Sequence, residues 1–309
     1  MSKTFKSNIC LLGTAIIWGF AFVAQRDSMD TIGPFMYSAL RMFIGALALI
    51  PVFMIGDKLK KKNNKAGDQK DIENKRDSMQ TLIKGGIATG VVIFFAANLQ
   101  QVGLVYTNAG KTAFITALYI LLVPIIGMFL KHKTNINNWI GACIGVAGLY
   151  FLCITTEFTI AKGDIIVFVG AFGWAAHILI VDYFAPKVDA AKLTCLQFAI
   201  AGIISLVVSL VTEDNTFIAA IECAPSLLYV GIMSSAVAFT LQVIGQKHAN
   251  PTTASILLST ESLFGAVSGF LFLHETMNGR ELLGCVLMLA AVIIAQIPAG
   301  KKSADDKSS

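Results

Sequence analysis

Charged residues are scarce in this chain. Asp, Glu, Lys and Arg together make up 14% of its 309 residues, whereas apolar residues make up 55%. The mean hydropathy of +0.71 lies well above the range of soluble proteins of this length. Little sequence therefore remains for a water-soluble domain, and the composition indicates a protein whose solvent is a lipid bilayer.

Patterns for disulfides, metals and nucleotides are also lacking. The six cysteines have no paired spacing for a disulfide framework or a metal site. A phosphate-binding loop ending in the GKT run at 110–112 would need glycine where Val105 stands, and a zinc-protease helix starting at His274 would need histidine where Asn278 stands. We therefore expect no cofactor, no metal and no enzymatic activity.

Ten apolar stretches have the length of a membrane-spanning helix. A bilayer core about 30 Å thick requires roughly 20 helical residues, and lipid does not tolerate unpaired backbone polar groups. The expected fold class is an all-α membrane protein with ten transmembrane helices. The predicted spans are residues 9–24, 34–56, 82–103, 112–130, 137–155, 163–184, 192–212, 225–246, 252–273 and 280–298.

Lysine and arginine are unevenly distributed between the two sides of this bundle. With the N-terminus in the cytoplasm, nineteen lie on the cytoplasmic side and four outside, with Arg41 inside a span. The basic segment 57–80, interpreted as a solvated linker, strengthens this bias but is not needed for it. We therefore expect a multi-pass protein of the cell (plasma) membrane with both termini cytoplasmic. The same pattern favours membrane lipid over nucleic acid as a partner.

The two halves of the sequence contain matching residues at fixed offsets. Trp18 and Trp174 are 156 positions apart, as are Arg41 and Gln197, and later matches occur at an offset of 141. We therefore predict two five-helix repeats, residues 1–158 and residues 159–309, the second with a polar C-terminal tail. Because five is an odd number, equivalent helices cross in opposite directions, as in inverted repeats that enclose a site near the membrane midplane.

Several motifs resemble the EamA-type branch of the drug/metabolite transporter superfamily. They are WGFAF at 18–22, LRMF at 40–43, TAFIT at 112–116 with VP at 123–124, TAS at 253–255 with Glu261, and LHE at 273–275 leading into LLG at 282–284. The resemblance covers all ten predicted helices and implies a central cavity with helices 5 and 10 at the periphery. It also implies transport of small metabolites, often amino acids. The family commonly has proline after this glutamate, and Ser262 leaves a kink there open.

Among the Arg, Lys, Asp, Glu and His side chains, three lie well inside predicted spans and away from the span ends, where burial is costly. Arg41 either snorkels to the headgroups or faces the cavity and attracts a carboxylate or phosphate group of a solute. Glu261, near the middle of its span, could exchange a proton, pair with a cationic amine, or be locked by hydrogen bonds between helices. His177 shares a helix face with Trp174 and could relay protons or act as a buried structural donor.

Two pairs of amide side chains lie inside predicted spans. Asn98 and Gln101 are three positions apart, and Gln242 and Gln246 are four apart, so each pair forms a polar stripe on one helix. In lipid these amides need hydrogen-bond partners, which either neighbouring helices or a solute could supply.

Aromatic side chains complete the candidate site. Trp18, Tyr119 and Trp174 could form apolar walls or cation–π faces, or could serve only as packing. The predicted substrate-binding residues are Trp18, Arg41, Asn98, Gln101, Tyr119, Trp174, His177, Gln242 and Glu261.

These features predict a secondary-active membrane transporter, with export as the expected direction, for small organic metabolites such as amino acids. The two inverted repeats would open a central cavity alternately to each side. A lipid-linked sugar flippase, an intramembrane enzyme and a non-transporting scaffold or sensor are the alternatives. The expected partners are a small organic solute and a coupled proton or ion. Gly141 and Gly145 on helix 5 could support a homodimer or pack within the chain.

Overall fold

The computed structural model describes residues 2–63, 69–107, 109–132, 134–154, 160–214, 217–272 and 278–297. Throughout these residues the regular structure is helical, without a strand. Nine helical segments within them are long and apolar enough to cross a membrane. A tenth span, residues 251–272, is divided into two helices. The predicted all-α fold with ten spans is confirmed.

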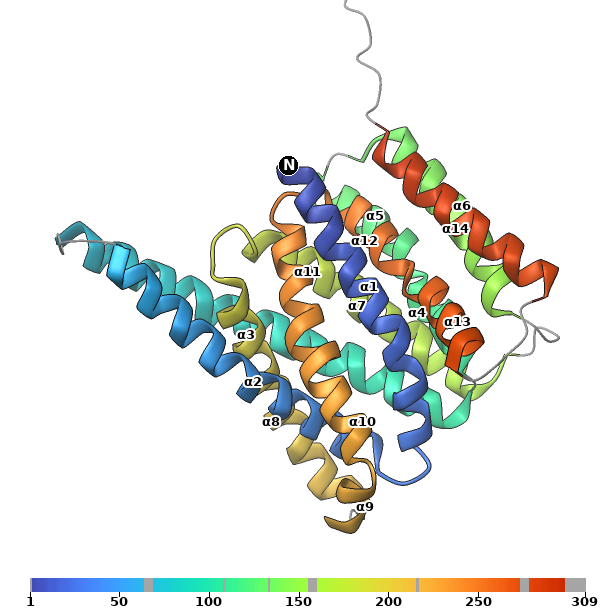
Figure 1. Ribbon diagram of the computed structural model, residues 1–309, viewed down its shortest axis with the longest axis horizontal. Coiled ribbons are helices and arrows are strands. Elements are labelled where there is room, and N and C mark those ends of the chain that lie inside the picture. The colour runs from blue at the N-terminus through green and yellow to red at the C-terminus, as the bar shows by residue number, and fades with distance from the viewer. Residues whose placement is uncertain are drawn as a thin grey trace, which may run out of the picture.

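The first repeat consists of five spans, of which the fourth is broken. Its helices are α1 (Lys3–Ser28), α2 (Pro34–Asn63), α3 (Gln69–Tyr106), α4 (Ala109–Ala117) with α5 (Tyr119–Phe129), and α6 (Ile136–Cys153). Figure 1 shows the end of α2 and the start of α3 projecting side by side beyond the bundle.

The second repeat has the same order of spans, with breaks in its third and fourth. Its helices are α7 (Lys162–Phe184), α8 (Ala190–Thr212), the short α9 (Phe217–Glu222), α10 (Ala224–Tyr229) with the π-helix η1 (Val230–Ala238) and α11 (Phe239–Gln246), α12 (Pro251–Ser259) with α13 (Glu261–Phe272), and α14 (Gly279–Gln296).

The basic segment 57–80 is not the linker that the sequence predicts. The helix α2 continues through Asn63 and α3 begins at Gln69, and only residues 64–68 of this segment lie outside the described part of the chain. Lysine, glutamate and glutamine are good helix formers, so a spanning helix that leaves the lipid can continue in water. Hydropathy marks where lipid ends and does not mark where the helix ends.

The largest packing contacts between the repeats have counterparts when the repeats are exchanged. The helix α3 packs against α7, and the equivalent third span of the second repeat, η1 and α11, packs against α1. Likewise α1 packs against α12 and α13, and α7 packs against α4 and α5. The helix α2 packs against its own equivalent α8, and α6 packs against its own equivalent α14, so exchanging the repeats leaves these two contacts unchanged. The bundle is therefore an inverted pair of five-helix repeats.

The central pair α2 and α8 is tied at both ends by acids at equivalent positions. Asp57 and Glu213 are 156 positions apart. Both carboxylate oxygens of Asp57 bind Nζ of Lys192, at 2.7 and 2.9 Å. The Glu213 carboxylate instead accepts the backbone N–H groups of Phe35 at 2.8 Å and Met36 at 2.9 Å, at the start of α2. A carboxylate there satisfies amides that the helix leaves unpaired.

The last span of each repeat, α6 or α14, lies at the periphery of the bundle, and the two run side by side (Figure 1). Gly141 and Gly148 allow this approach, because a Cβ atom on either would lie within 3 Å of the α14 backbone. Gly141, one of the two glycines that could have supported a homodimer, therefore contacts a helix of the same chain.

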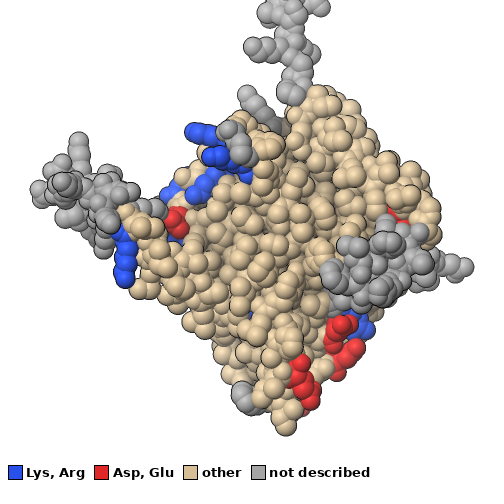
Figure 2. Space-filling model, viewed as in Figure 1, with Lys and Arg blue, Asp and Glu red and all other residues tan. Residues whose placement is uncertain are grey.

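A broad uncharged band crosses the middle of the surface in Figure 2. Lysine and arginine gather mainly at the end of the bundle where α1 begins, and acidic residues gather mainly at the opposite end. We call these ends the N-terminal face and the far face. The band has the form expected of a lipid-facing surface.

Gly19 lets α1 approach the backbone of α13 closely. A Cβ atom at Gly19 would lie 2.6 Å from the carbonyl oxygen of Glu261 and 2.7 Å from the amide nitrogen of Gly265. Neither backbone atom can rotate away, so one helix would have to move. We expect Gly19→Ala to destabilise the protein by roughly 1–3 kcal/mol and to lower the midpoint of thermal unfolding in detergent.

Gly13 offers a matched control on the same helix. A Cβ atom there would meet only Leu241, at an ordinary distance of 3.6 Å. Because alanine is the better helix former by about 1 kcal/mol, Gly13→Ala should leave the midpoint unchanged or raise it. Equal midpoints for the two variants would contradict the close contact at Gly19.

Candidate functional site

A cavity with about 410 Å³ of empty space lies between the two repeats. It is lined by side chains from seven of the ten spans, and α6, α8 and α14 contribute none of them. The lining residues are Trp18, Phe22, Gln25, Arg41, Gln100, Thr116, Tyr119, Trp174, Ser234, Phe239 and Glu261.

The cavity extends from the middle of the bundle toward the far face. Gln25 lies close to the end of α1, and Arg41 lies two turns after the start of α2. Gln100 lies less than two turns before the end of α3. Trp174 and Glu261 lie near the middle of their spans and form the deepest part. The lining residues therefore come from the middle and the far half of the membrane.

Both fourth spans are interrupted beside the cavity. The helix α4 gives way to α5 at Leu118, and α12 gives way to α13 at Thr260. The sequence predicts one continuous span across Leu118 and leaves a kink open beside Glu261. Near the second break, the hydroxyl of Ser259 donates to the carbonyl of Ile256 at 2.9 Å, and that of Thr260 donates to the carbonyl of Leu257 at 2.6 Å. Such local bonds compete with helical ones, so the break occurs without proline at position 262.

Tyr119 follows the first break and Glu261 follows the second, and these two side chains contact each other. The Tyr119 hydroxyl donates a hydrogen bond of 3.1 Å to Oε1 of Glu261. Tyr119 is 2% exposed and Glu261 is 4% exposed, and both line the cavity. Interrupted helices of this kind occur in transporters, where irregular backbone lines a binding site at mid-membrane.

Arg41 presents a charge to this cavity without an ion pair. Its side chain is 5% exposed, and its Nε atom has no hydrogen-bond partner. Within the described part of the chain, no acidic side chain lies within salt-bridge distance of it. Buried guanidinium groups are normally paired, so an unpaired one that faces a cavity can bind a solute anion.

Three aromatic rings, from α1, α7 and α11, form part of the cavity wall. The ring centroids of Trp18 and Phe239 are 4.7 Å apart, and that of Trp174 lies 6.2 Å from both. The Trp18 indole donates a 3.2 Å hydrogen bond to the carbonyl of Ser234, whereas Nε1 of Trp174 has no partner. The wall combines a broad apolar face with one free donor.

The π-helix η1 positions Ser234 at the cavity. Each turn of a π-helix accommodates an extra residue, which rotates the following side chains around the helix axis. The residues after η1 therefore face directions that a regular 3.6-residue period does not predict. Phe239, at the start of α11, enters the cavity, whereas Gln242 does not.

Five of the nine predicted binding residues line the cavity. They are Trp18, Arg41, Tyr119, Trp174 and Glu261. The structure brings these side chains together from five different spans, and the sequence could not specify that proximity. Their role in binding stays a prediction.

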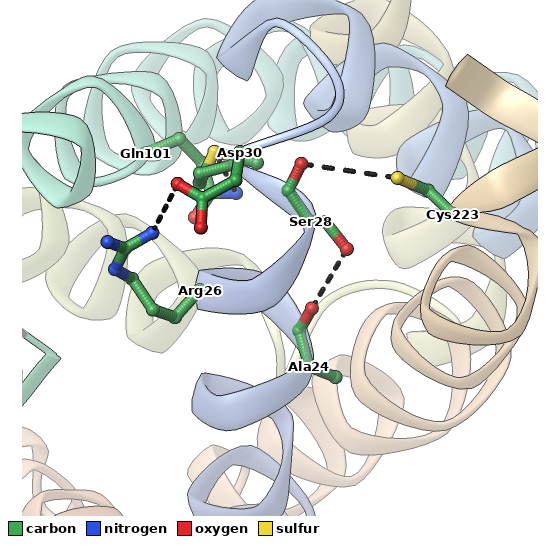
Figure 3. A network of polar contacts seen from close by, with 7 residues as sticks. Ala24, Arg26, Ser28, Asp30, Gln101 and Cys223 are labelled. Carbon is green, nitrogen blue, oxygen red and sulfur yellow. Dashed lines mark hydrogen bonds and ion pairs between the residues drawn. The ribbon is translucent and has the colours of Figure 1, made fainter.

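The other four predicted residues are buried outside the cavity. Nδ2 of Asn98 donates to Oγ of Ser205 at 2.9 Å and so joins α3 to α8. Gln101 lies close to the end of α1, in the polar network of Figure 3, where its Nε2 donates to the sulfur of Met29 at 3.7 Å. Gln242 is 1% exposed, and its Oε1 atom has no partner.

His177 is the fourth of these residues. Its Nε2 atom lies 3.1 Å from Oε1 of Gln197, and the side chain is fully buried. Its ring lies 5.8 Å from that of Phe239, which lines the cavity on the other side. His177 is therefore separated from the cavity by one aromatic layer.

Six lining residues were missed by the sequence reasoning. Phe22 and Gln25 follow Trp18 at spacings of four and seven, the period of one helix face, and this signal could have identified them. Gln100 lines the cavity, whereas its neighbour Gln101 was predicted to do so. The prediction therefore assigned the cavity-facing side of this helix one residue too far along the chain. Thr116, Ser234 and Phe239 carried no comparable signal.

The fold and the cavity define a class of protein. Two inverted bundles of spanning helices enclose a buried polar cavity with a free guanidinium, a carboxyl group and an aromatic wall. Spanning helices of two inverted repeats around a shared internal cavity are the architecture of a membrane transporter.

The family comparison agrees with this class. The EamA-like transporter family model matches residues 5–154 and again residues 161–296, and the chain belongs to this family. A crystal structure of a protein with 16% sequence identity superposes with a TM-score of 0.74 and covers 94% of this chain and 96% of that one, which shows the shared fold.

Two of the similar curated proteins carry transporter names without a stated solute. An "Uncharacterized transporter" of Archaeoglobus fulgidus is 27% identical, over 96% of this chain and 87% of its own length. The "Uncharacterized transporter YoaV" of Bacillus subtilis is 23% identical, over 92% of this chain and 94% of its own length. A chloroplastic WAT1-related protein of Arabidopsis thaliana is 24% identical, over 96% of this chain and 71% of its own length.

Proposed function

We propose that this protein is a secondary-active exporter of small organic metabolites such as amino acids, and that its halves, residues 1–158 and 159–309, work by alternating access. One observation carries the proposal. A buried, unpaired Arg41 and a buried Glu261 face the same cavity, and this cavity lies between the two repeats of a transporter-family protein.

Each part of the cavity has a role in this proposal. Arg41 binds an anionic group of the solute, because a planar guanidinium offers several donors to a carboxylate. Glu261 carries a proton during the cycle or pairs with a cationic group of the solute. The aromatic wall of Trp18, Trp174 and Phe239 contacts the apolar part of the solute.

The proposed setting is the cell membrane, with both termini in the cytoplasm. This orientation is supported by the lysine and arginine that gather at the N-terminal face (Figure 2). The cavity would then extend toward the outer side of the membrane in this structure. Transport would draw on the gradients of the solute and of a coupled proton or ion.

A two-stage experiment tests the function. Amino acids, amines and organic acids are first screened for compounds that raise the thermal unfolding midpoint of the purified protein, since a bound solute stabilises the folded state. Compounds that do so are then used in labelled counterflow with proteoliposomes. We expect counterflow that saturates with solute and is absent from protein-free vesicles. Binding without counterflow would reject transport in favour of a sensor or scaffold.

A further inference from the structure

The cavity occupies the middle and the far half of the membrane, and the inverted repeat gives its far-half residues equivalents in the other half. At the offset of 156, Arg41 corresponds to Gln197 and Ser38 corresponds to Thr194. Arg41 is the eighth residue of α2, which begins at the far face, and Gln197 is the eighth residue of α8, which begins at the N-terminal face. The two positions therefore lie at mirrored depths.

In this structure the equivalent region is closed and contains unsatisfied polar atoms. Nδ1 of His177, Oγ1 of Thr194 and Nε2 of Gln197 are buried without a hydrogen-bond partner. All three side chains are fully buried. An unsatisfied buried polar group costs about 1–3 kcal/mol, so three of them close together would be stabilised by a polar group that reached them.

One aromatic side chain separates these atoms from the cavity. The Phe239 ring contacts Trp18 and Trp174 on the cavity side. Its centroid also lies 5.8 Å from that of His177 and 5.0 Å from that of Phe198. A displacement of Phe239 would connect His177 and Gln197 to the space beside Trp174.

We propose that His177 and Gln197 form a second polar subsite, which contacts the solute when the cavity is closed at the far face and open at the N-terminal face. The subsite takes the same anionic or polar group that Arg41 holds in the present state, because it occupies the repeat-equivalent position. The imidazole and the amide supply neutral donors instead of a permanent charge, so the group is held less tightly on this side. This inference rests on the proposed transport function.

Side-specific kinetics test this subsite in proteoliposomes of defined protein orientation. Leucine has nearly the size of glutamine but no polar atoms. We expect Gln197→Leu to raise the KM for solute presented at the N-terminal face at least tenfold, and to change the KM at the far face by less than twofold. A purely structural role would change both values together. A Gln197→Leu variant with both values unchanged would overturn the proposal.

Thiol accessibility provides a second measurement, in a background whose six native cysteines are replaced. Gln197→Cys and Thr194→Cys, one turn apart on α8, should react with a membrane-impermeant thiol reagent added at the N-terminal face, and saturating solute should slow the reaction. Ser205→Cys on the same helix is the control. Ser205 is equally buried but bonds Asn98, so we expect no reaction from either face.

The outcomes separate this inference from the function on which it rests. Absence of counterflow in the unsubstituted protein rejects the proposed transport. Counterflow with both α8 variants unreactive from the N-terminal face, or reactive from the far face alone, rejects the subsite and leaves transport standing. Reaction of Ser205→Cys at the same rate would indicate general loosening of α8 and would equally reject a defined subsite.

Discussion

Replacement of Arg41 by glutamine is expected to reduce kcat/KM for transport by roughly 10- to 150-fold. A hydrogen bond to a charged group contributes about 1.5–3 kcal/mol, and each 1.4 kcal/mol corresponds to a factor of ten in an equilibrium constant. Arg41 lines the cavity and has no ion-pair partner among the described residues, so its interaction with a solute anion is not shared with another acid. Initial rates of counterflow over a range of solute concentrations measure the effect.

The same variant should be at least as stable as the unsubstituted protein in the absence of solute. An arginine at the centre of a spanning helix costs about 2.5–3.5 kcal/mol on insertion scales. Arg41 lies two turns inside α2 and incurs part of this cost, and no carboxylate in the described structure offsets it. If Arg41 instead supported the fold, its removal would lower the thermal unfolding midpoint. The sign of the change therefore distinguishes a binding role from a structural one.

Arg26→Gln is the matched control for Arg41→Gln. Arg26 lies at the far face and forms an exposed i,i+4 ion pair with Asp30 at 3.0 Å, visible in Figure 3. Exposed pairs of this kind contribute little, so neither transport nor stability should change measurably. Unimpaired transport of an anionic solute by Arg41→Gln would contradict the assigned role, as would an equal loss in Arg26→Gln.

Hydropathy was sufficient to predict the spans because each one must satisfy its backbone within about 30 Å of lipid. The repeat was predicted from several matches at offsets of 156 and 141, the Trp18 and Trp174 pair among them, together with the odd number of spans in each half. The interruption at Leu118 was not predicted and that at Thr260 was left open, because both positions lie in runs of apolar and hydroxyl residues that are compatible with a continuous helix. Serine and threonine can bond inward along the helix or outward to a neighbour, and sequence does not specify which.

The candidate site was only partly predictable for a related reason. Placing an arginine or a glutamate inside the membrane costs so much free energy that its position in the sequence alone indicates a special environment. Both Arg41 and Glu261 line the cavity. Amides are less costly and serve either as cavity lining or as bonds between helices. Asn98 bonds Ser205, and the π-helix η1 changes the phase of the residues near Gln242. Neither the hydrogen bond nor the change of helix phase can be predicted from the local sequence pattern.

Glu261→Gln is expected to separate exchange of solute from its coupling to protons. Glutamine has the shape of glutamate, and its carbonyl oxygen can still accept the hydrogen bond from Tyr119. It cannot bind and release a proton. If Glu261 is the proton carrier, counterflow should remain within about threefold, whereas accumulation of solute driven by an imposed pH gradient should fall to the level of protein-free vesicles.

Two further variants define what this result means. Tyr119→Phe removes the hydrogen-bond donor but keeps the carboxyl group, so accumulation driven by the pH gradient should persist. Glu222→Gln changes an exposed carboxyl group outside the cavity and should leave both activities intact. Both activities are measured on the same vesicle preparation, so that differences in protein orientation cancel.

The alternative role of Glu261, as a partner for a cationic amine, predicts a different pattern. Glutamine would then weaken counterflow itself, and the loss would be restricted to solutes that carry an amine, while analogues without the amine would exchange normally. A Glu261→Gln variant that still concentrates solute against a pH gradient and exchanges every analogue would exclude both roles. Glu261 and Tyr119 would then act only to join the two interrupted helices, and the coupling group would have to be sought elsewhere along the cavity.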